Sequence, residues 1–295
     1  MIFRSKAPLR IGLAGGGTDV SPYCDLYGGA ILNTTISHAA YASIETLDAN
    51  KIIVETLDRK EKQEFSWDTI LPIDGELNLL KGVYNRIQKD YGIKKCGIRL
   101  STFVDAPAGS GLGTSSTLVV AILGAFIEML RLPFSQYDAA HYAYDIERNN
   151  LQLAGGRQDQ YAATFGGVNF MEFYKEDKVI VNPLRIRDEY MNELENNLVL
   201  YFTSTSRESA EIIKEQVSNV NKKNEKSIEA MHQLKEQAKM MKEALLKGKL
   251  NDIGEILDYG FQQKRLMAHN ISNTSIEEVY DAAKKAGATG GKISG

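Results

Sequence analysis

The sequence predicts an α+β protein with strands and helices in both halves of the chain. Apolar and polar residues alternate over residues 98–103, which is the pattern of a half-buried strand, and residues 7–14 form an earlier strand-like run. Residues 114–130 are nearly all apolar or small, a run too long for an ordinary strand and typical of a buried helix. The region 206–266 has a helical pattern, with breaks near residues 219–224 and at Gly248.

Length and composition limit the classes of protein that fit. A chain of 295 residues buries one large core or two moderate ones, and 43% hydrophobic with 25% charged residues is ordinary for a globular protein. The net charge of -3 argues against a nucleic-acid partner. Two cysteines without CxxC spacing give neither a disulfide framework nor a zinc site. The N-terminus lacks an apolar signal core and no run reaches the ~20 apolar residues of a membrane span. We therefore expect a soluble, cytoplasmic protein without a nucleic-acid or membrane partner.

The remaining elements follow in order along the chain. Three short strands are expected at residues 30–35, 41–47 and 52–56, with a hairpin turn at 48–50 between the last two. Helical spacing predicts a helix over 77–91, and Ser135 with Asp138 predicts the start of another. Later elements are strands at 168–174, 179–182 and 197–203, and a helix that Thr274 and Glu277 would cap. We place a domain boundary near residue 181, which gives domains 1–181 and 182–295.

A glycine-rich stretch over residues 107–116 lies between the strand at 98–103 and the long apolar helix. Glycines without Cβ atoms let backbone N–H groups converge on an anion, and the helix that follows adds its positive N-terminal end. The hydroxyls at the loop–helix junction suit N-capping or a metal ion that accompanies phosphates. The alternative is a turn that only caps a core helix. The candidate nucleotide-binding residues are Pro107, Gly109, Ser110, Gly111, Leu112, Gly113, Thr114, Ser115 and Ser116.

Two familiar phosphate-binding loops do not fit this stretch. A P-loop has a Lys directly before its hydroxyl residue, whereas Thr114 follows Gly113. A dinucleotide-binding fingerprint needs a second strand after the helix, whereas residues 135–149 are again helical in pattern. The P-loop is therefore excluded, and a dinucleotide-dependent oxidoreductase is the weaker alternative.

The first strand ends in Gly15, Gly16 and Gly17, followed by Thr18 and Asp19. Glycines at a strand end let another group approach the backbone, and the carboxylate of Asp19 could accept hydrogen bonds from sugar hydroxyls. The alternative is that Asp19 caps the next turn.

Acidic residues follow in two helical segments further along the chain. Glu147 lies near a helix C-terminus, where a negative charge opposes the helix dipole, so a bound cation or a surface neighbour is expected beside it. Asp159 follows the pair Gly155 and Gly156 and enters a short helix, which it could also cap. Arg157 lies two residues before Asp159, and its side chain could reach a substrate or point into solvent.

Three segments together resemble the galactokinase, homoserine kinase, mevalonate kinase and phosphomevalonate kinase (GHMP kinase) superfamily. Residues 107–116 resemble its motif Pro-x-Gly-x-Gly-Leu-Gly-Ser-Ser-Ala, with departures at Thr114 and Ser116. Residues 8–19 resemble its first motif, with Gly16 and Gly17 replacing Glu and His. This Gly-Gly-Gly-Thr-Asp form is similar to that of heptose 7-phosphate kinases and fucokinase-like members. Residues 155–160 resemble its Gly-x-x-Asp catalytic segment.

The resemblance implies a two-domain GHMP-kinase-like fold, with mixed sheets and helices packed against them, and an ATP-dependent sugar kinase. It implies that Asp159 steers the acceptor hydroxyl with support from Arg10, and that Ser115 and Glu147 hold Mg²⁺. The acceptor implied is the anomeric hydroxyl of a heptose 7-phosphate, a small-molecule partner, in the synthesis of nucleotide-activated heptose for capsule or surface glycan. Another sugar kinase of the superfamily, or an inactive nucleotide or sugar sensor, is the alternative. The implied sugar-binding residues are Gly16, Gly17, Thr18, Asp19 and Arg157.

The last residues, 290–295, resemble the beginning of the superfamily's third motif. Because the resemblance stops inside that motif, we expect the C-terminal domain to continue beyond Gly295.

Overall fold

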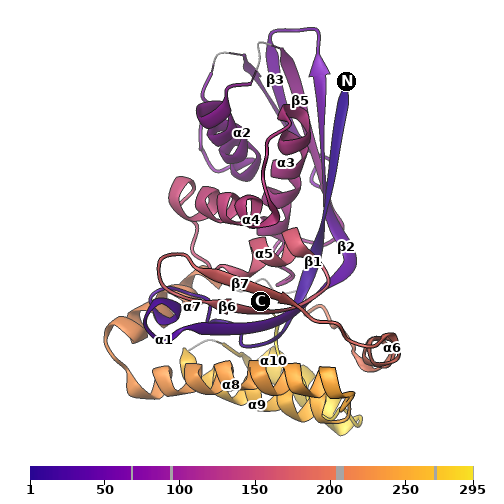
Figure 1. The fold of residues 1–295 in the computed structure, drawn as a ribbon, viewed down its shortest axis with the longest axis vertical. Coiled ribbons are helices and arrows are strands. Elements are labelled where there is room, and N and C mark those ends of the chain that lie inside the picture. Colours follow the sequence, from indigo (N-terminus) through magenta and orange to yellow (C-terminus); the bar gives the residue numbers. More distant parts are fainter. Residues whose placement is uncertain (68, 94–95, 204–208, 269–270, 295) are drawn as a thin grey trace. The chain divides into compact units, whose positions relative to one another are not determined.

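The structure is a computed structural model that describes residues 1–67, 69–93, 96–203, 209–268 and 271–294. It confirms the α+β class, since strands and helices occur in both parts of the chain (Figure 1). The chain forms two compact units. Unit 1 contains residues 1–10, 35–153 and 159–166, and unit 2 contains residues 11–34, 154–158 and 167–295. This division differs from the predicted boundary near residue 181.

Unit 1 contains a sheet with the strand order β4-β3-β5-β2, and β1 pairs with β2. The strands are β1 (Ile2–Ala14), β2 (Gly29–Leu47), β3 (Lys51–Thr56), β4 (Glu61–Ser66) and β5 (Gly97–Val104). β5 is antiparallel to β2 and parallel to β3, so that Leu100 lies opposite both Ile44 and Val54. Both β1 and β2 contain residues of both units. β1 begins in unit 1 and ends in unit 2, and β2 begins in unit 2 and ends in unit 1.

The helices of unit 1 follow from their apolar residues. α3 is almost entirely apolar, which suits a helix buried on most of its surface, and its Val119, Leu123 and Phe126 are fully buried. They pack in one core with apolar residues of α2 and of the sheet. The predicted capping box of Ser135 and Asp138 begins α4. The helices are α2 (Asn78–Tyr91), α3 (Thr114–Leu130), α4 (Gln136–Asp145), the π-helical turn η1 (Ile146–Asn150) and α5 (Gln158–Phe165).

Unit 2 contains further strands of the same seven-stranded sheet and a group of helices. β6 (Val168–Phe173) is antiparallel to residues 29–34 of β2 and to β7 (Val179–Pro183). The predicted breaks in the helical region 206–266 are confirmed. Asn224 caps the start of α8, and Gly248, with a φ of 68°, follows its last residue. Figure 1 shows α8 alongside α9. The helices are α1 (Tyr23–Tyr27), α6 (Asp188–Asn197), α7 (Ser209–Asn221), α8 (Glu225–Lys247), α9 (Asp252–Met267) and α10 (Thr274–Lys285).

Three predicted elements differ from the structure. Residues 30–35 and 41–47 belong to one continuous strand, β2, and the predicted hairpin with residues 52–56 is wrong because β5 lies between β2 and β3. The predicted strand at 197–203 is wrong as well: α6 extends to Asn197, and among the described residues no strand pairs with the exposed run that follows. Asn273, not Thr274, caps α10.

Among the helices of the described residues, none combines the length and the apolar character needed to cross a bilayer.

Candidate active site

The glycine-rich loop of unit 1 has the backbone geometry of an anion-binding loop. Gly109, Gly111 and Gly113 have φ values of 76°, 75° and 74°, a left-handed conformation that glycine adopts without steric cost. Gly113 is the N-cap residue of α3 and no side-chain hydrogen bond caps this helix. The predicted capping by the hydroxyls of residues 114–116 therefore does not occur. The N–H groups of the first turn of α3 are not bonded by a capping side chain, which suits a helix end that receives phosphate.

A cavity of about 330 Å³ lies beside this loop in unit 1. Ala108, Thr114 and Ser115 contribute to its wall from the loop and from α3. Further parts of its wall come from β3, β5, the start of α2 and the apolar side chains of Leu151 and Leu153, together with two charged side chains, Asp58 and Arg59. The volume is within the range of small-molecule pockets.

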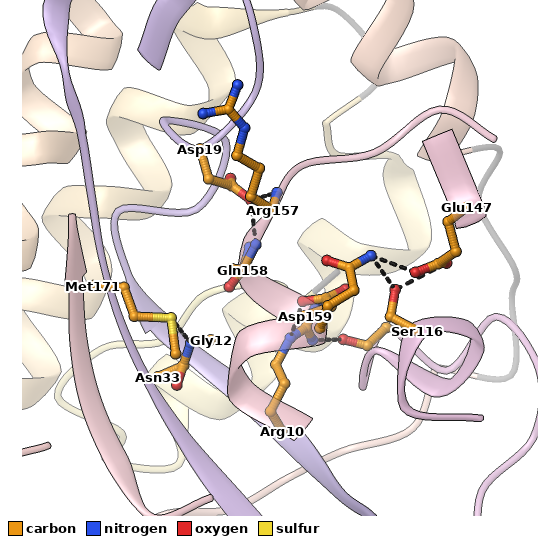
Figure 2. A network of polar contacts seen from close by, with 12 residues as sticks. Arg10, Gly12, Asp19, Asn33, Ser116, Glu147, Arg157, Gln158, Asp159 and Met171 are labelled. Atoms are coloured by element: carbon orange, nitrogen blue, oxygen red, sulfur yellow. Dashed lines mark hydrogen bonds and ion pairs between the residues drawn. The ribbon is translucent and has the colours of Figure 1, made fainter. Parts of the chain in front are cut away.

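Asp159 and Arg10 form a bidentate ion pair in unit 1 (Figure 2). Arg10 Nε lies 2.8 Å from Asp159 Oδ1, and Arg10 Nη2 lies 3.0 Å from Asp159 Oδ2. Arg10 Nη1 also donates a hydrogen bond of 2.5 Å to the carbonyl oxygen of Gly111. A Cβ atom on Gly113 would lie 3.3 Å from Asp159 Cγ, so the glycine allows the loop to approach this pair closely. The arginine thus connects the carboxylate to the glycine-rich loop, and a planar guanidinium fixes the carboxylate orientation better than an ammonium group would.

Glu147 lies in a buried polar cluster of unit 1 (Figure 2). Its side chain accepts a hydrogen bond of 3.0 Å from Ser116 Oγ and another from Gln160 Nε2. Glu147, Ser116 and Gln160 are 2%, 4% and 0% exposed. Burial raises the pKa of Glu147, and its hydrogen bonds and the nearby Arg148 only partly oppose this effect. Burial excludes a surface position for Glu147, but the neighbouring Arg148 does lie beside it, with Nη1 3.9 Å from Glu147 Oε1.

Ser115 and Glu147, the two predicted Mg²⁺ ligands, form no hydrogen bond with each other among the described residues, and their role as metal ligands remains a prediction. Ser115 is exposed and lines the cavity, whereas Ser116 contacts the carboxylate. Sequence reasoning also missed Gln160, although an amide side chain directly after Asp159 was a signal that could have been followed. Gln160 Nε2 donates to Ser116 Oγ as well, at 3.0 Å, and so connects the cluster.

Unit 2 contains the turn of Gly15, Gly16 and Gly17. The carboxylate of Asp19 is 2% exposed and its Oδ2 accepts hydrogen bonds from the backbone N–H groups of Arg157 and Gln158, at 2.8 and 3.0 Å. A Cβ atom on Gly156 would lie 1.9 Å from Asp19 Oδ2, so only glycine allows this approach. Asp19 therefore fixes the segment that directly precedes Asp159 in the sequence.

Two predicted sugar-binding side chains form contacts inside unit 2 instead. The Thr18 hydroxyl is fully buried, lies 2.9 Å from the carbonyl oxygens of both Gly15 and Ala30, and accepts a hydrogen bond from Ala30 N. The guanidinium of Arg157 donates to the carbonyl oxygen of Tyr174 at 2.8 Å and pairs with Asp25 and Asp177 at 3.1 and 3.0 Å. These contacts do not support direct binding of substrate by either side chain.

A glycine loop at a helix start, an arginine–aspartate pair and a buried glutamate are the features that the resemblance to phosphotransferases predicted. Residues 78–167 match the family model described as the GHMP kinases N terminal domain. The chain is 46% identical over 292 residues, 99% of its length and 86% of the relative, to the D-glycero-alpha-D-manno-heptose 7-phosphate kinase of Campylobacter jejuni. The chain belongs to the GHMP kinase family, and the prediction of a kinase of this family is confirmed.

Solved structures agree with this assignment. A D-glycero-D-manno-heptose 1-phosphate kinase from Bacteroides thetaiotaomicron is 47% identical and matches all of this chain and 86% of its own, with a TM-score of 0.83. The galactokinase of Lactococcus lactis, complexed with galactose, shares the fold with a TM-score of 0.70 at 19% identity. It covers 96% of this chain, and this chain covers 80% of it.

Proposed function

We propose that this enzyme transfers the γ-phosphoryl group of ATP to the anomeric hydroxyl of D-glycero-D-manno-heptose 7-phosphate. The products are ADP and the heptose 1,7-bisphosphate, a precursor of nucleotide-activated heptose for capsule or surface glycan. Identity of 46% to a heptose 7-phosphate kinase over nearly the full chain supports the acceptor. The bidentate pair of Arg10 and Asp159 beside the glycine-rich loop is the single observation that supports the chemistry most.

The nucleotide fits the loop and the cavity of unit 1. Backbone N–H groups of the loop and of the first turn of α3 would bind the triphosphate. The cavity of about 330 Å³, lined by Thr114, Ser115 and apolar side chains such as Leu118, would receive the rest of the nucleotide. Its size and its mostly apolar wall favour this assignment.

The residues beside Glu147 fit a Mg²⁺ ion. The carboxylate and the Ser116 hydroxyl supply oxygen atoms, and Gln160 Oε1 is buried next to them without a hydrogen-bond partner among the described residues. Mg²⁺ in kinases is held by one or two carboxylates together with substrate phosphates, so a single buried glutamate suffices. When bound, the ion would neutralise charge on the phosphates. Glu147 and either Ser115 or Ser116 are the residues that would hold it.

Asp159 would act on the acceptor hydroxyl. As the sugar oxygen attacks the γ-phosphorus and the bond to the β-phosphate oxygen breaks, the hydroxyl proton passes to the carboxylate of Asp159. Arg10 holds both carboxylate oxygens and so fixes the orientation of Asp159. Positioning and charge neutralisation dominate phosphoryl transfer, because its transition state is loose.

The turn of unit 2 would bind the acceptor. Gly16 and Gly17 remain the proposed sugar-binding residues, whereas Thr18, Asp19 and Arg157 would support the turn through their contacts inside unit 2.

ADP release with different acceptors tests this proposal. We expect turnover with ATP and heptose 7-phosphate to exceed turnover with heptose 1-phosphate, with L-fucose and with no sugar. Asp159→Asn should lower kcat by roughly 10²- to 10⁴-fold and leave ATP binding intact. The relatives' names place the acceptor phosphate at different positions, so a preference for heptose 1-phosphate would contradict the proposed acceptor. ATP binding without turnover on any sugar would favour a nucleotide sensor.

A further inference from the structure

Glu147 lies in a helical turn of an unusual kind. After α4 the chain forms the π-helical turn η1, and the N–H group of Leu151 donates to the carbonyl oxygen of Ile146 at 2.9 Å. Such turns are rare, occur mostly as single turns within α-helices and are frequent at functional sites. A π-helical turn contains more residues than an α-helical turn, so it changes the directions of the side chains that it carries. Here the Glu147 side chain is directed inward, at Ser116 (Figure 2).

Arg86 of α2 contacts both ends of this turn. Its Nη1 donates a hydrogen bond of 2.5 Å to Asp145 Oδ2, and Asp145 directly precedes η1. The same nitrogen donates to Asn150 Oδ1 at 2.8 Å, and Asn150 is the last residue of η1. One guanidinium nitrogen therefore joins the residue before the turn to the residue that ends it. This bridge fixes both ends of the turn relative to α2.

The guanidinium of Arg86 is itself held in place. Its Nε donates to Asp90 Oδ2 on the same helix, and its Cζ lies 4.8 Å from the centroid of the Tyr142 ring of α4. The Tyr142 hydroxyl donates to the same oxygen of Asp90 at 2.9 Å. The side chain of Arg86 is 21% exposed, so these contacts are partly shielded from solvent. A planar guanidinium that is held on several sides directs its remaining N–H groups better than a flexible ammonium group would.

We propose that Arg86 is a positioning residue for the metal-binding carboxylate. Because it holds both ends of η1, it keeps the turn in the conformation that directs Glu147 at Ser116. This inference rests on the proposed function, since it assumes that Glu147 holds Mg²⁺ when nucleotide is bound. Arg86 touches neither the ion nor the substrates and acts only through the turn. Residues outside the ligand shell commonly fix metal ligands in this way.

Two aspartates that share Arg86 provide a matched pair of variants. Asp145→Ala removes a contact with the turn, whereas Asp90→Ala removes a contact within α2. Both carboxylates lie near a helix C-terminus, and their side chains are 24% and 27% exposed. Each also contacts a further side chain, Asn149 for Asp145 and Tyr142 for Asp90. The variants therefore differ chiefly in whether η1 loses its support.

ADP binding measures the effect without turnover. Isothermal titration calorimetry of the full chain with ADP, once in excess Mg²⁺ and once in EDTA, gives two dissociation constants, whose ratio reports how much Mg²⁺ tightens binding. We expect Asp145→Ala and Arg86→Met to reduce this ratio by roughly tenfold, the lower end of the effect of residues that orient metal ligands. Asp90→Ala should keep the ratio of the parent protein. In EDTA, all three variants should bind ADP as the parent protein does.

Asn150→Ala tests the other end of the bridge without removing a charge. Asn150 is exposed, so this variant should fold with a melting temperature close to that of the parent protein. We expect the ratio to fall here too, by a smaller factor, because Asn150 pairs with Arg86 without a charge of its own. In turnover, the Mg²⁺ concentration for half-maximal rate should rise while the KM for the sugar stays unchanged.

The outcomes separate the role of Arg86 from the proposed function. If Asp145→Ala and Asn150→Ala keep the ratio of the parent protein, or if Asp90→Ala lowers it equally, the inference is wrong, whether or not the enzyme turns the sugar over. If the ratio falls as expected and the parent protein does not phosphorylate heptose 7-phosphate, the role of Arg86 stands and the proposed reaction fails. ADP binding to the parent protein that is indifferent to Mg²⁺ would overturn both the role of Arg86 and the proposed Mg²⁺ site.

Discussion

At the scale of single residues, Glu147 is a deeply buried charged group of the candidate site. A carboxylate that is 2% exposed costs free energy when ionised unless hydrogen bonds or a cation compensate. Ser116 and Gln160 supply two hydrogen bonds, yet the pKa of Glu147 remains raised by burial. When no cation is bound, the ionised carboxylate of Glu147 therefore lowers the free energy of unfolding.

This cost predicts how Glu147→Gln changes stability with pH. A raised pKa means that the folded state holds the proton more tightly than the unfolded state does, so the stability contributed by Glu147 is present below its unfolded pKa and is lost as pH rises through the folded pKa. A glutamine side chain does not titrate, so Glu147→Gln has no such loss of stability as pH rises. With EDTA present, the melting temperature of Glu147→Gln relative to the parent protein should be higher at pH 7.5 than at pH 5.

Two further readouts belong to this prediction. Addition of Mg²⁺ and ADP should stabilise the parent protein more than Glu147→Gln, because the variant lacks the proposed metal-binding carboxylate. A difference in melting temperature between the two proteins that does not change with pH would contradict the burial argument.

At the scale of elements, the glycines of the glycine-rich loop have two separate effects. They adopt a backbone conformation with positive φ, and they let the loop approach Asp159 closely. Gly113→Ala introduces a Cβ atom at a φ of 74° and 3.3 Å from Asp159 Cγ. Gly92→Ala is the control, since Gly92 also has a positive φ, 65°, but no atom lies within 4 Å of the new Cβ atom. Gly113→Ala should lose roughly 1 to 2 kcal/mol of unfolding free energy, measured by urea denaturation. Gly92→Ala should lose at least as much, because its ψ of 115° lies outside the left-handed helical region. Only Gly113→Ala should also lose kinase activity; equal activity in the two variants would argue against the loop's role at Asp159.

Elements with strong local patterns were predictable from the sequence. The apolar run of α3, the spacing of α2 and the breaks around α8 depend on neighbouring residues, and the structure confirms them. The position of β5 between β2 and β3 was not predictable, because strand order depends on pairing between segments far apart in the chain. The hydrogen bond from Ser116 to Glu147 was missed for the same reason, because these residues are 31 positions apart in the sequence.

At the scale of the whole molecule, each compact unit contains three separate segments of the chain, so no single boundary in the sequence divides the two units. Leu13, Leu32 and Phe170 precede the predicted boundary near residue 181, yet they share a buried cluster of unit 2 with Met241 and Leu245 of α8. The sequence alone could not assign these residues to one cluster, because membership of a core depends on tertiary contacts. The domain boundary near residue 181 therefore remains a prediction.

This arrangement predicts that a fragment of residues 1–181 does not fold as an independent domain. Without α8 and α9, the apolar side chains of Leu13, Leu32 and Phe170 would lose their buried partners. Urea denaturation followed by circular dichroism should show a broad, weakly cooperative transition for the fragment and a steeper one for the full chain. A fragment that unfolds as cooperatively as the full chain would show that the cluster is dispensable.

The central claim is that Asp159 directs phosphoryl transfer to the anomeric hydroxyl of a heptose 7-phosphate. Phosphorus-31 NMR of a reaction with ATP, Mg²⁺ and heptose 7-phosphate tests it most directly. The parent protein should produce ADP and a second sugar phosphorus signal whose coupling assigns it to the anomeric carbon, while Asp159→Asn should produce it far more slowly. A new phosphate on any other carbon, or equal rates in the two proteins, would contradict the account.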